Sequence, residues 1–226
     1  MEKEEFLNQI KPKPYLINKE YDFQKRYESL LEIAGVICPG FNISKEQQNI
    51  YENAVKYFSG DDSCEFDLKK GLYIYGRIGN GKTLFFKLLN TLNKAVWSGN
   101  DFNILTINDL VDGIAREGYK YFSLSGITLS GDGLNLKNVN NIWIRHMLID
   151  DMGQGVSSIR YFGSEVNVIR DFFQRRYCAF TDCSALTHVA TNIPPAEIKE
   201  EYGEFISSRM REMFNIIAFP GEDKRK

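Results

Sequence analysis

The segment GLYIYGRIGNGKT, residues 71–83, decides the fold of this 226-residue chain. Residues 72–75 form a short apolar run that ends at a glycine, which is typical of a buried parallel strand. After the glycine-rich stretch, apolar residues recur on one face of a helix, at Phe85, Leu88, Leu89, Leu92 and Val96. The segment therefore predicts a strand, a loop and a helix in direct succession.

The loop, residues 76–83, matches the P-loop pattern G-x-x-x-x-G-K-[ST]. Glycines let the backbone wrap closely around phosphates with its amides pointing inward, and the helix that follows adds partial positive charge. Lys82 is expected to reach the β- and γ-phosphates, and the Thr83 hydroxyl to bind Mg²⁺. The loop thus predicts a site for ATP or ADP with Mg²⁺. Its predicted binding residues are Gly76, Gly79, Asn80, Gly81, Lys82, Thr83 and Leu84.

Two further apolar runs end in polar side chains. Residues 147–149 precede Asp150 and Asp151, so we expect Asp150 to hold Mg²⁺, directly or through water, and Asp151 to polarise the attacking water. Residues 187–191 precede Asn192, which could orient that water between the loop and Asp151. The alternative for Asn192 is the start of a turn before Pro194.

Strands alternate with helices along the chain, which predicts an α/β fold with a parallel five-stranded sheet flanked by helices. The expected strands are residues 72–75, 104–107, 143–150, 187–191 and 214–219. Residues 1–40, with Pro12 and Pro14, predict a short helical N-terminal arm whose apolar residues pack on the main domain, residues 41–226, or on a partner.

Local signals mark several helix starts. Ser44 with Gln47 fits a capping box, in which each side chain satisfies an orphan amide. Asn108 or Asp109 can cap the helix after the second strand, and Ser164 is expected to open the helix after the third. Residues 123–141, rich in Gly, Ser, Asn and Asp, predict a hairpin or an exposed insertion.

Composition excludes several classes of protein. The formal net charge of −2 argues against an open basic surface that coats nucleic acid by charge alone. No apolar run approaches the roughly 20 residues that span a bilayer, and the N-terminus lacks the apolar core of a signal peptide, so we expect a cytoplasmic protein without membrane contact. His146 and His188 lie within apolar strands and are interpreted as core or rim residues.

In order and spacing, these elements resemble the AAA+ family, and more closely the DnaC/DnaI-type helicase loaders, over residues 41–226. The segments that carry the resemblance are GLYIYGRIGNGKT, MLIDDMG, GSEVNVIRDFFQRRY, THVATN and YGEFISSRMREMFNIIAF with the closing GEDKRK. The resemblance implies that Asn192 is the sensor 1 residue, that Arg209 is the arginine finger offered to an adjacent subunit, and that Arg225 lies near the sensor 2 position. Arg211 competes with Arg209 for the finger role.

The resemblance also implies an activity and partners. It implies Mg²⁺-dependent hydrolysis of ATP to ADP and phosphate, with ATP bound between neighbouring copies in a homo-oligomer. The implied partners are a replicative DNA helicase and single-stranded DNA, in DNA replication of a phage or mobile element. Lys120, Tyr121 and Phe122 could offer charge and stacking to such DNA, or could be a surface loop with core aromatics.

Two other functions fit the same motifs. A transposition helper of the IstB type would choose a transposase instead of a helicase as its partner. A nucleotide-gated binding module would hardly hydrolyse ATP, and Asp151 makes this conceivable because many members of the family have the longer Glu there. Capture of the partner distinguishes the transposition helper from the helicase loader. A phosphate-release assay distinguishes the nucleotide-gated module from an active ATPase.

Overall fold

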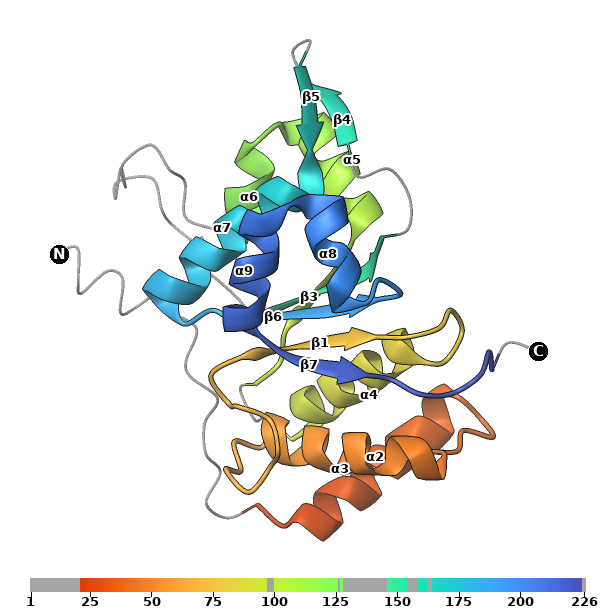
Figure 1. Ribbon diagram of the computed structural model, residues 1–226. Helices are drawn as coiled ribbons and strands as arrows, with labels where there is room; N and C mark the ends of the chain where they lie inside the picture. The colour runs from red at the N-terminus through yellow and green to blue at the C-terminus, as the bar shows by residue number, and fades with distance from the viewer. Residues whose placement is uncertain are drawn as a thin grey trace, which may run out of the picture.

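The computed structural model describes residues 21–96, 100–125, 127, 146–153, 158–161 and 164–224 (Figure 1). Five strands pair in parallel in the order β2-β3-β6-β1-β7, which confirms the predicted sheet. The strands are β1 Gly71–Tyr75, β2 Asn103–Thr106, β3 Met147–Met152, β6 Thr187–Thr191 and β7 Phe214–Ala218. Because all five run in one direction, their carboxyl ends meet at one edge of the sheet.

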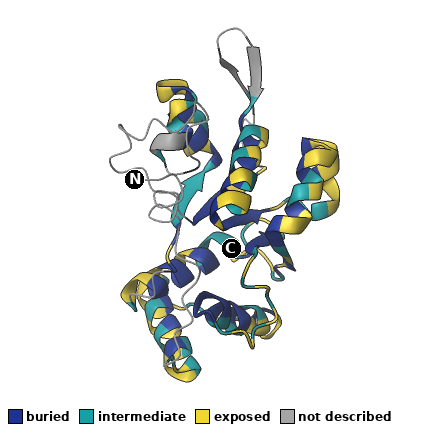
Figure 2. Cartoon of the chain, turned by 90° about the vertical axis from the view of Figure 1, so that its left-hand side faces the viewer, coloured by how far each residue is buried: buried dark blue, intermediate teal, exposed yellow. Residues whose placement is uncertain are grey.

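Helices cover both faces of the sheet (Figure 1). On one face lie α2 Phe23–Ile37, α3 Lys45–Phe58 and α4 Lys82–Ala95, and on the other lie α5 Ile107–Glu117, α6 Lys120–Leu124, α7 Val168–Cys183, α8 Pro195–Tyr202 and α9 Glu204–Met213. Each layer has its own cluster of buried apolar residues against the sheet. Figure 2 shows the exposed residues on the outer sides of these helices. Within the described ranges, no helix is both long and apolar enough to cross a bilayer.

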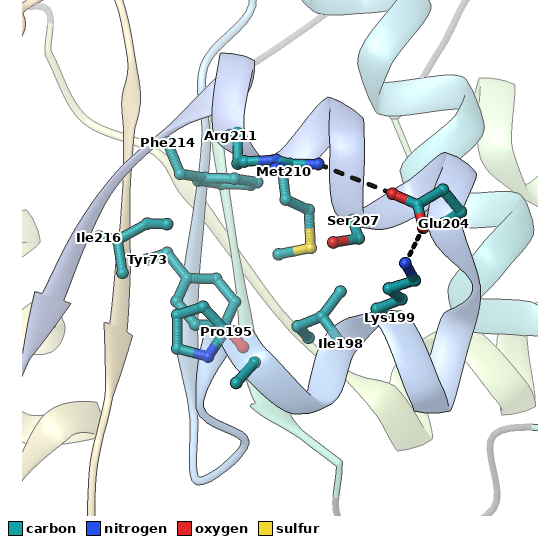
Figure 3. Close-up of a pocket in the computed structure, with 11 residues that line it drawn as sticks. Tyr73, Pro195, Ile198, Lys199, Glu204, Ser207, Met210, Arg211, Phe214 and Ile216 are labelled. Atoms are coloured by element: carbon teal, nitrogen blue, oxygen red, sulfur yellow. Dashed lines mark ion pairs between the residues drawn. The ribbon is translucent and has the colours of Figure 1, made fainter.

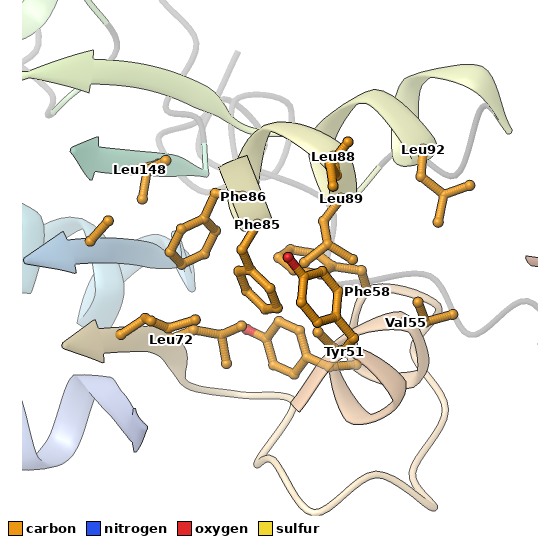
Figure 4. Packing of buried hydrophobic residues seen from close by; sticks show 14 of the residues in the cluster. Tyr51, Val55, Phe58, Leu72, Phe85, Phe86, Leu88, Leu89, Leu92 and Leu148 are labelled. Atoms are coloured by element: carbon orange, nitrogen blue, oxygen red, sulfur yellow. The ribbon is translucent and has the colours of Figure 1, made fainter. Parts of the chain in front are cut away.

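The first core cluster is built mainly from aromatic and leucine side chains. Phe85 and Phe86 of α4 contact each other edge to face and meet Tyr51 and Phe58 of α3 over the sheet (Figure 4). Leu30 of α2 is fully buried in the same cluster, whereas Val36, near the end of α2, is 83% exposed. The buried apolar residues of this helix, Leu30 and Ala34, thus pack on the layer that carries the P-loop helix. The predicted division of the chain at residue 40 stays a prediction.

Three local predictions at helix starts were wrong in whole or in part. Ser44 is the N-cap of α3, as expected, but its side chain makes no capping hydrogen bond. The Gln47 side chain donates to the carbonyls of Asn80 and Pro220, so the predicted capping box is absent. Helix α5 is capped by Thr106, with Asp109 as the reciprocal member of the capping box, and not by Asn108 or Asp109.

The third error lies at Ser164, which begins a strand and not a helix. Strand β5, Ser164–Asn167, pairs antiparallel with β4, Ser158–Tyr161, in a hairpin that projects beyond the helical layer (Figure 1). The helix begins later, where the Asn167 side chain accepts a hydrogen bond from the Arg170 N–H. Of the predicted insertion, residues 126 and 128–141 lie outside the described residues.

Candidate functional site

The loop between β1 and α4 adopts a conformation that requires glycine. Gly79 and Gly81 have φ of +80° and +102°, in the left-handed region that L side chains rarely adopt. A Cβ at Gly79 would also collide with the Asp223 carboxylate. Gly81 is the N-cap of α4 and has no side chain with which to cap the first helical amides. The amino end of α4 therefore presents backbone N–H groups to an anion.

Lys82 lies folded over this loop. Its ammonium donates hydrogen bonds to the carbonyl oxygens of Gly76 at 2.9 Å and Arg77 at 2.8 Å, and to Asn80 Oδ1 at 3.1 Å. The Asn80 side chain is fully buried, and its Nδ2 donates to the Phe219 carbonyl at 2.6 Å. Asn80 thus ties the loop to the end of β7 and also orients Lys82.

Thr83 and Asp150 meet directly, as the sequence predicted for two ligands of one metal ion. The Thr83 hydroxyl donates to Asp150 Oδ1 at 2.9 Å, and Asp150 is only 4% exposed. Burial raises the pKa of Asp150, the Thr83 hydrogen bond opposes this, and the Asp151 charge adds to the rise. A buried carboxylate beside a hydroxyl supplies the oxygen ligands that Mg²⁺ prefers, and a cation there would offset the cost of burying its charge.

Asp151 occupies a bulge at the end of β3. Its φ is +56°, and the pairing of β3 with β6 shifts register between Ile149 and Met152. The Asp151 N–H donates to Asp150 Oδ1 at 3.1 Å. The bulge exposes Asp151, although its neighbours Asp150 and Met152 are buried. Asp151 and the P-loop line the same cavity.

This cavity has a volume of about 710 Å³, in the size range of small-molecule sites. Its walls are residues 78–84 of the loop and the start of α4, residues 37–42 between α2 and α3, and the side chains of Lys87, Asp151 and Lys224. The sequence predicted residues for a nucleotide and Mg²⁺ site. Those that the structure describes therefore line this cavity or contact a residue that lines it.

The other predicted residues lie apart from the cavity. In the part of the chain that the structure describes, the cavity is lined by neither Asn192 nor Arg209 nor Arg211. Arg225 lies outside the described residues. Asn192 directly follows β6, so it sits at the same edge of the sheet as the loop and Asp150. Helix α9, which carries Arg209, leads into the amino end of β7, at the opposite edge of the sheet. Figure 1 shows this course of α9 into β7.

The two arginines of α9 have different surroundings. The Arg209 guanidinium carbon lies 3.4 Å from the ring centroid of Phe205 and 4.3 Å from that of Tyr177, and its Nη1 has no hydrogen-bond partner among the described residues. Arg211 lies at the rim of a second cavity of about 400 Å³ between α8 and α9, where its Nη2 is 3.8 Å from Glu204 Oε1 (Figure 3). Glu204 also pairs with Lys199.

The aromatic residues suggested for DNA stacking belong to the core. Phe122 is fully buried, and the Arg175 guanidinium carbon lies 4.7 Å from its ring centroid. The Tyr121 ring packs where a Cβ on Gly113 would stand. The stacking hypothesis is therefore wrong for Phe122, and the alternative of core aromatics holds. His146 and His188 are also core residues, as predicted, and each accepts a backbone N–H at Nδ1.

Sequence reasoning missed Gln47 and Lys224. Gln47 is fully buried and donates to the carbonyls of Asn80 and Pro220, and Lys224 lines the cavity beside the loop. The signal for Gln47 was a polar residue one helical turn before Tyr51, on the buried face of α3. For Lys224 the only signal was its place in a basic C-terminal segment, next to Arg225.

Comparisons with known proteins place the fold. The sequence matches no protein-family model and no curated protein. Its structure is similar to that of DnaI, with a TM-score of 0.55 and 17% identity over 81% of this chain and 90% of that chain. It is also similar to AMPPCP-bound DnaA from Aquifex aeolicus, with a TM-score of 0.52 and 12% identity over 92% and 53% of the two chains.

A third similar structure is the replication initiator DnaA bound to AMPPCP and single-stranded DNA, with a TM-score of 0.53 and 12% identity. It covers 92% of this chain and 52% of that chain, so this chain spans about half the length of both DnaA chains. At such identities the likeness is one of fold. The chain shares with these proteins the α/β fold that the sequence predicted, a parallel five-stranded sheet flanked by helices.

Proposed function

We propose that this chain binds ATP with Mg²⁺ at residues 76–84 and hydrolyses it to ADP and phosphate. The observation that carries the proposal is the 2.9 Å hydrogen bond from Thr83 to the buried carboxylate of Asp150, beside the uncapped amino end of α4. The DnaA structures of the same fold, which hold AMPPCP, support it. Together these features give a cation site next to an anion site, as Mg²⁺-bound phosphates need.

Each side chain has a task in this proposal. Lys82 exchanges its bonds to loop carbonyls for bonds to phosphate oxygens, and the α4 amides donate to the same phosphates. Thr83 and Asp150 hold Mg²⁺, which when bound neutralises charge on the phosphate chain. Asp151 accepts a hydrogen bond from the attacking water, and Asn192, from the neighbouring strand end, fixes that water in place.

A second copy of the chain completes the site in this proposal. Arg209 lies toward the edge of the sheet opposite the loop, so it cannot serve the loop of its own chain but can serve that of a neighbour. An arginine placed there would neutralise charge that develops on the transferred phosphate. The chain is therefore proposed to work as a homo-oligomer that forms when nucleotide binds.

For the biological role, we propose a DnaC-like helicase loader, with a replicative helicase and single-stranded DNA as partners. The fold shared with DnaI and with a DNA-bound replication initiator supports this proposal. The arm, residues 1–40, is the candidate contact for the helicase. Capture on the immobilised chain with ATP should retain a hexameric replicative helicase, and retention of a transposase in its place would favour the IstB-like alternative.

The activity itself is tested by phosphate release with Mg²⁺ and ATP. We expect turnover in the parent, its loss in Lys82→Ala, and parent-like turnover in Lys94→Ala, because Lys94 is an exposed lysine at the far end of α4. Turnover of Lys82→Ala at the parent rate would show that the phosphates bind elsewhere. A parent that binds ATP but releases no phosphate, with or without single-stranded DNA, would favour the nucleotide-gated module.

A further inference from the structure

The guanidinium of Arg209 lies between aromatic rings of two helices. Its central carbon is 3.4 Å from the ring centroid of Phe205, one helical turn earlier on α9, and 4.3 Å from the ring centroid of Tyr177 on α7. Helix α9 lies alongside α7 (Figure 1). Because a ring stacks on the guanidinium from each helix, the side chain of Arg209 is restricted in its rotation and in the tilt of its plane.

The Phe205 ring contributes little to the core. Its side chain is 52% exposed, although phenylalanine is a large apolar residue. Ile206 and Met210, on the buried side of the same helix, belong to the second core cluster, and Phe205 does not. The main described contact of this ring is with a charged group, so the ring serves the placement of Arg209 more than the stability of the fold.

The charge of Arg209 has no counter-charge in the part of the chain that the structure describes. It pairs with no carboxylate there, and its Nη1 is buried without a hydrogen-bond partner. Glu212, one turn later on α9, is within the usual reach of such an arginine, but its Oε2 accepts a hydrogen bond from the Tyr177 hydroxyl at 2.9 Å. Tyr177 therefore engages this carboxylate and also stacks on the arginine. An unpaired guanidinium against apolar rings is costly to desolvate, and an anion from another molecule would offset that cost.

We propose that Phe205 and Tyr177 are positioning residues for Arg209, which hold its guanidinium in place for the phosphate chain bound to a neighbouring copy. The inference rests on the proposed function, since it concerns the arginine that completes the shared site. An arginine that is free in solvent samples many rotamers, and fixing one of them during the reaction costs entropy. The two rings lower that cost because they restrict the side chain before the neighbour binds.

Steady-state ATP hydrolysis tests the role of the rings. In Phe205→Leu, kcat should fall on the order of 10- to 100-fold, as when a catalytic group is misplaced. The KM for ATP should stay close to the parent value, because the P-loop that binds the nucleotide is intact. Phe205→Tyr keeps an aromatic ring and should retain parent-like kcat, whereas Tyr177→Leu should lose activity as Phe205→Leu does. Leu31→Ala, at an exposed apolar residue of α2, is the control and should match the parent.

Mixtures of variants distinguish the positioning of Arg209 from general support of the fold. Phe205→Leu keeps an intact P-loop, so mixing it with Lys82→Ala should restore turnover, because the Lys82→Ala subunits supply a correctly held Arg209. Mixing Phe205→Leu with Arg209→Ala should not restore it, because neither variant supplies one. The double variant Phe205→Leu/Arg209→Ala should be no slower than Arg209→Ala alone, since the residue that the ring positions is then absent.

Parent-like kcat in Phe205→Leu and Tyr177→Leu, beside an inactive Arg209→Ala, would refute the inference and leave the proposed function intact. Restoration of Phe205→Leu by Arg209→Ala but not by Lys82→Ala would also overturn it, because the ring would then serve the P-loop of its own subunit. Parent-like turnover in Lys82→Ala would instead refute the proposed function itself. The thermal midpoint of each variant without nucleotide shows whether the fold is kept.

Discussion

At the scale of single residues, the chemistry depends on backbone conformation as much as on residue type. Asp151 was predicted to polarise the attacking water, but its φ of +56° and the bulge beside it could not be inferred from the sequence. Left-handed conformations cost of order 1 kcal/mol for most L residues, and Asp tolerates them better than most. The Asp151 carboxylate thus lines the cavity because the bulge interrupts β3. This bulge arises where β3 shifts register against β6.

Asp151→Asn isolates the charge of this residue, since Asn also tolerates the left-handed region. We expect the thermal midpoint and ATP affinity to stay close to the parent values, while phosphate release falls on the order of 10²- to 10³-fold, as for loss of a group that positions or deprotonates water. Asp112→Asn, on the exposed face of α5, is the matched control. Parent-like turnover in Asp151→Asn would remove Asp151 from the mechanism.

At the scale of elements, periodicity was a better guide than capping signals. The apolar spacing at Phe85, Leu88, Leu89 and Leu92 predicted the helix after the loop, which the structure has as α4, because a buried face must repeat at helical spacing whatever the context. Ser164 was misinterpreted because a serine can cap a helix, end a loop or join a hairpin, and tertiary contacts decide among these. Ser44 does begin α3, but without the predicted capping box. The side chain of Gln47 had better partners in Pro220 and Asn80 than in the amide of Ser44.

Helix α9 gives the test of the shared site. Arg209→Ala should retain ATP binding and lose turnover on the order of 10³-fold or more, as for other arginine fingers. Mixing Arg209→Ala with Lys82→Ala should restore turnover, because one subunit then supplies an intact loop and its neighbour an intact arginine. Arg211→Ala should behave like the parent, since Glu204 already neutralises Arg211 at the rim of the second cavity.

Two results would contradict a site shared between subunits. One is parent-like ATP hydrolysis by Arg209→Ala, and the other is an inactive mixture of Arg209→Ala and Lys82→Ala in which both variants associate. Size-exclusion chromatography with ATP shows whether they associate.

At the scale of the whole molecule, the alternation of strands and helices was enough to predict the parallel sheet. The attachment of residues 219–224 to the P-loop was not predictable, because it depends on contacts such as that of Gln47 with Pro220, 173 positions apart, which no local pattern contains. His188 is another long-range contact, since its Nδ1 accepts the Leu72 N–H and joins two strands. Sequence reasoning therefore found the loop and both aspartates, and missed what holds the loop in place.

The buried His188 predicts how stability depends on pH. Burial lowers its pKa well below the usual value, and the charges of His146 and Arg176 lower it further. The folded state keeps His188 neutral, whereas the unfolded chain binds a proton below about pH 6.5, so the unfolding free energy should fall as pH drops below that value. The slope from one such group is at most about 1.4 kcal/mol per pH unit.

Urea unfolding between pH 7.5 and pH 5 measures this slope. His188→Gln, which keeps an acceptor for the Leu72 N–H, should flatten it. An identical slope in that variant would assign the pH dependence to other groups.

Nucleotide binding at the P-loop cavity is the central claim, and a titration of ATP with Mg²⁺ tests it most directly. We expect saturable binding at one site per chain in the parent, its loss in Lys82→Ala, and parent-like binding in Lys94→Ala. Binding of equal affinity in the parent and in Lys82→Ala, with both proteins folded, would contradict this claim.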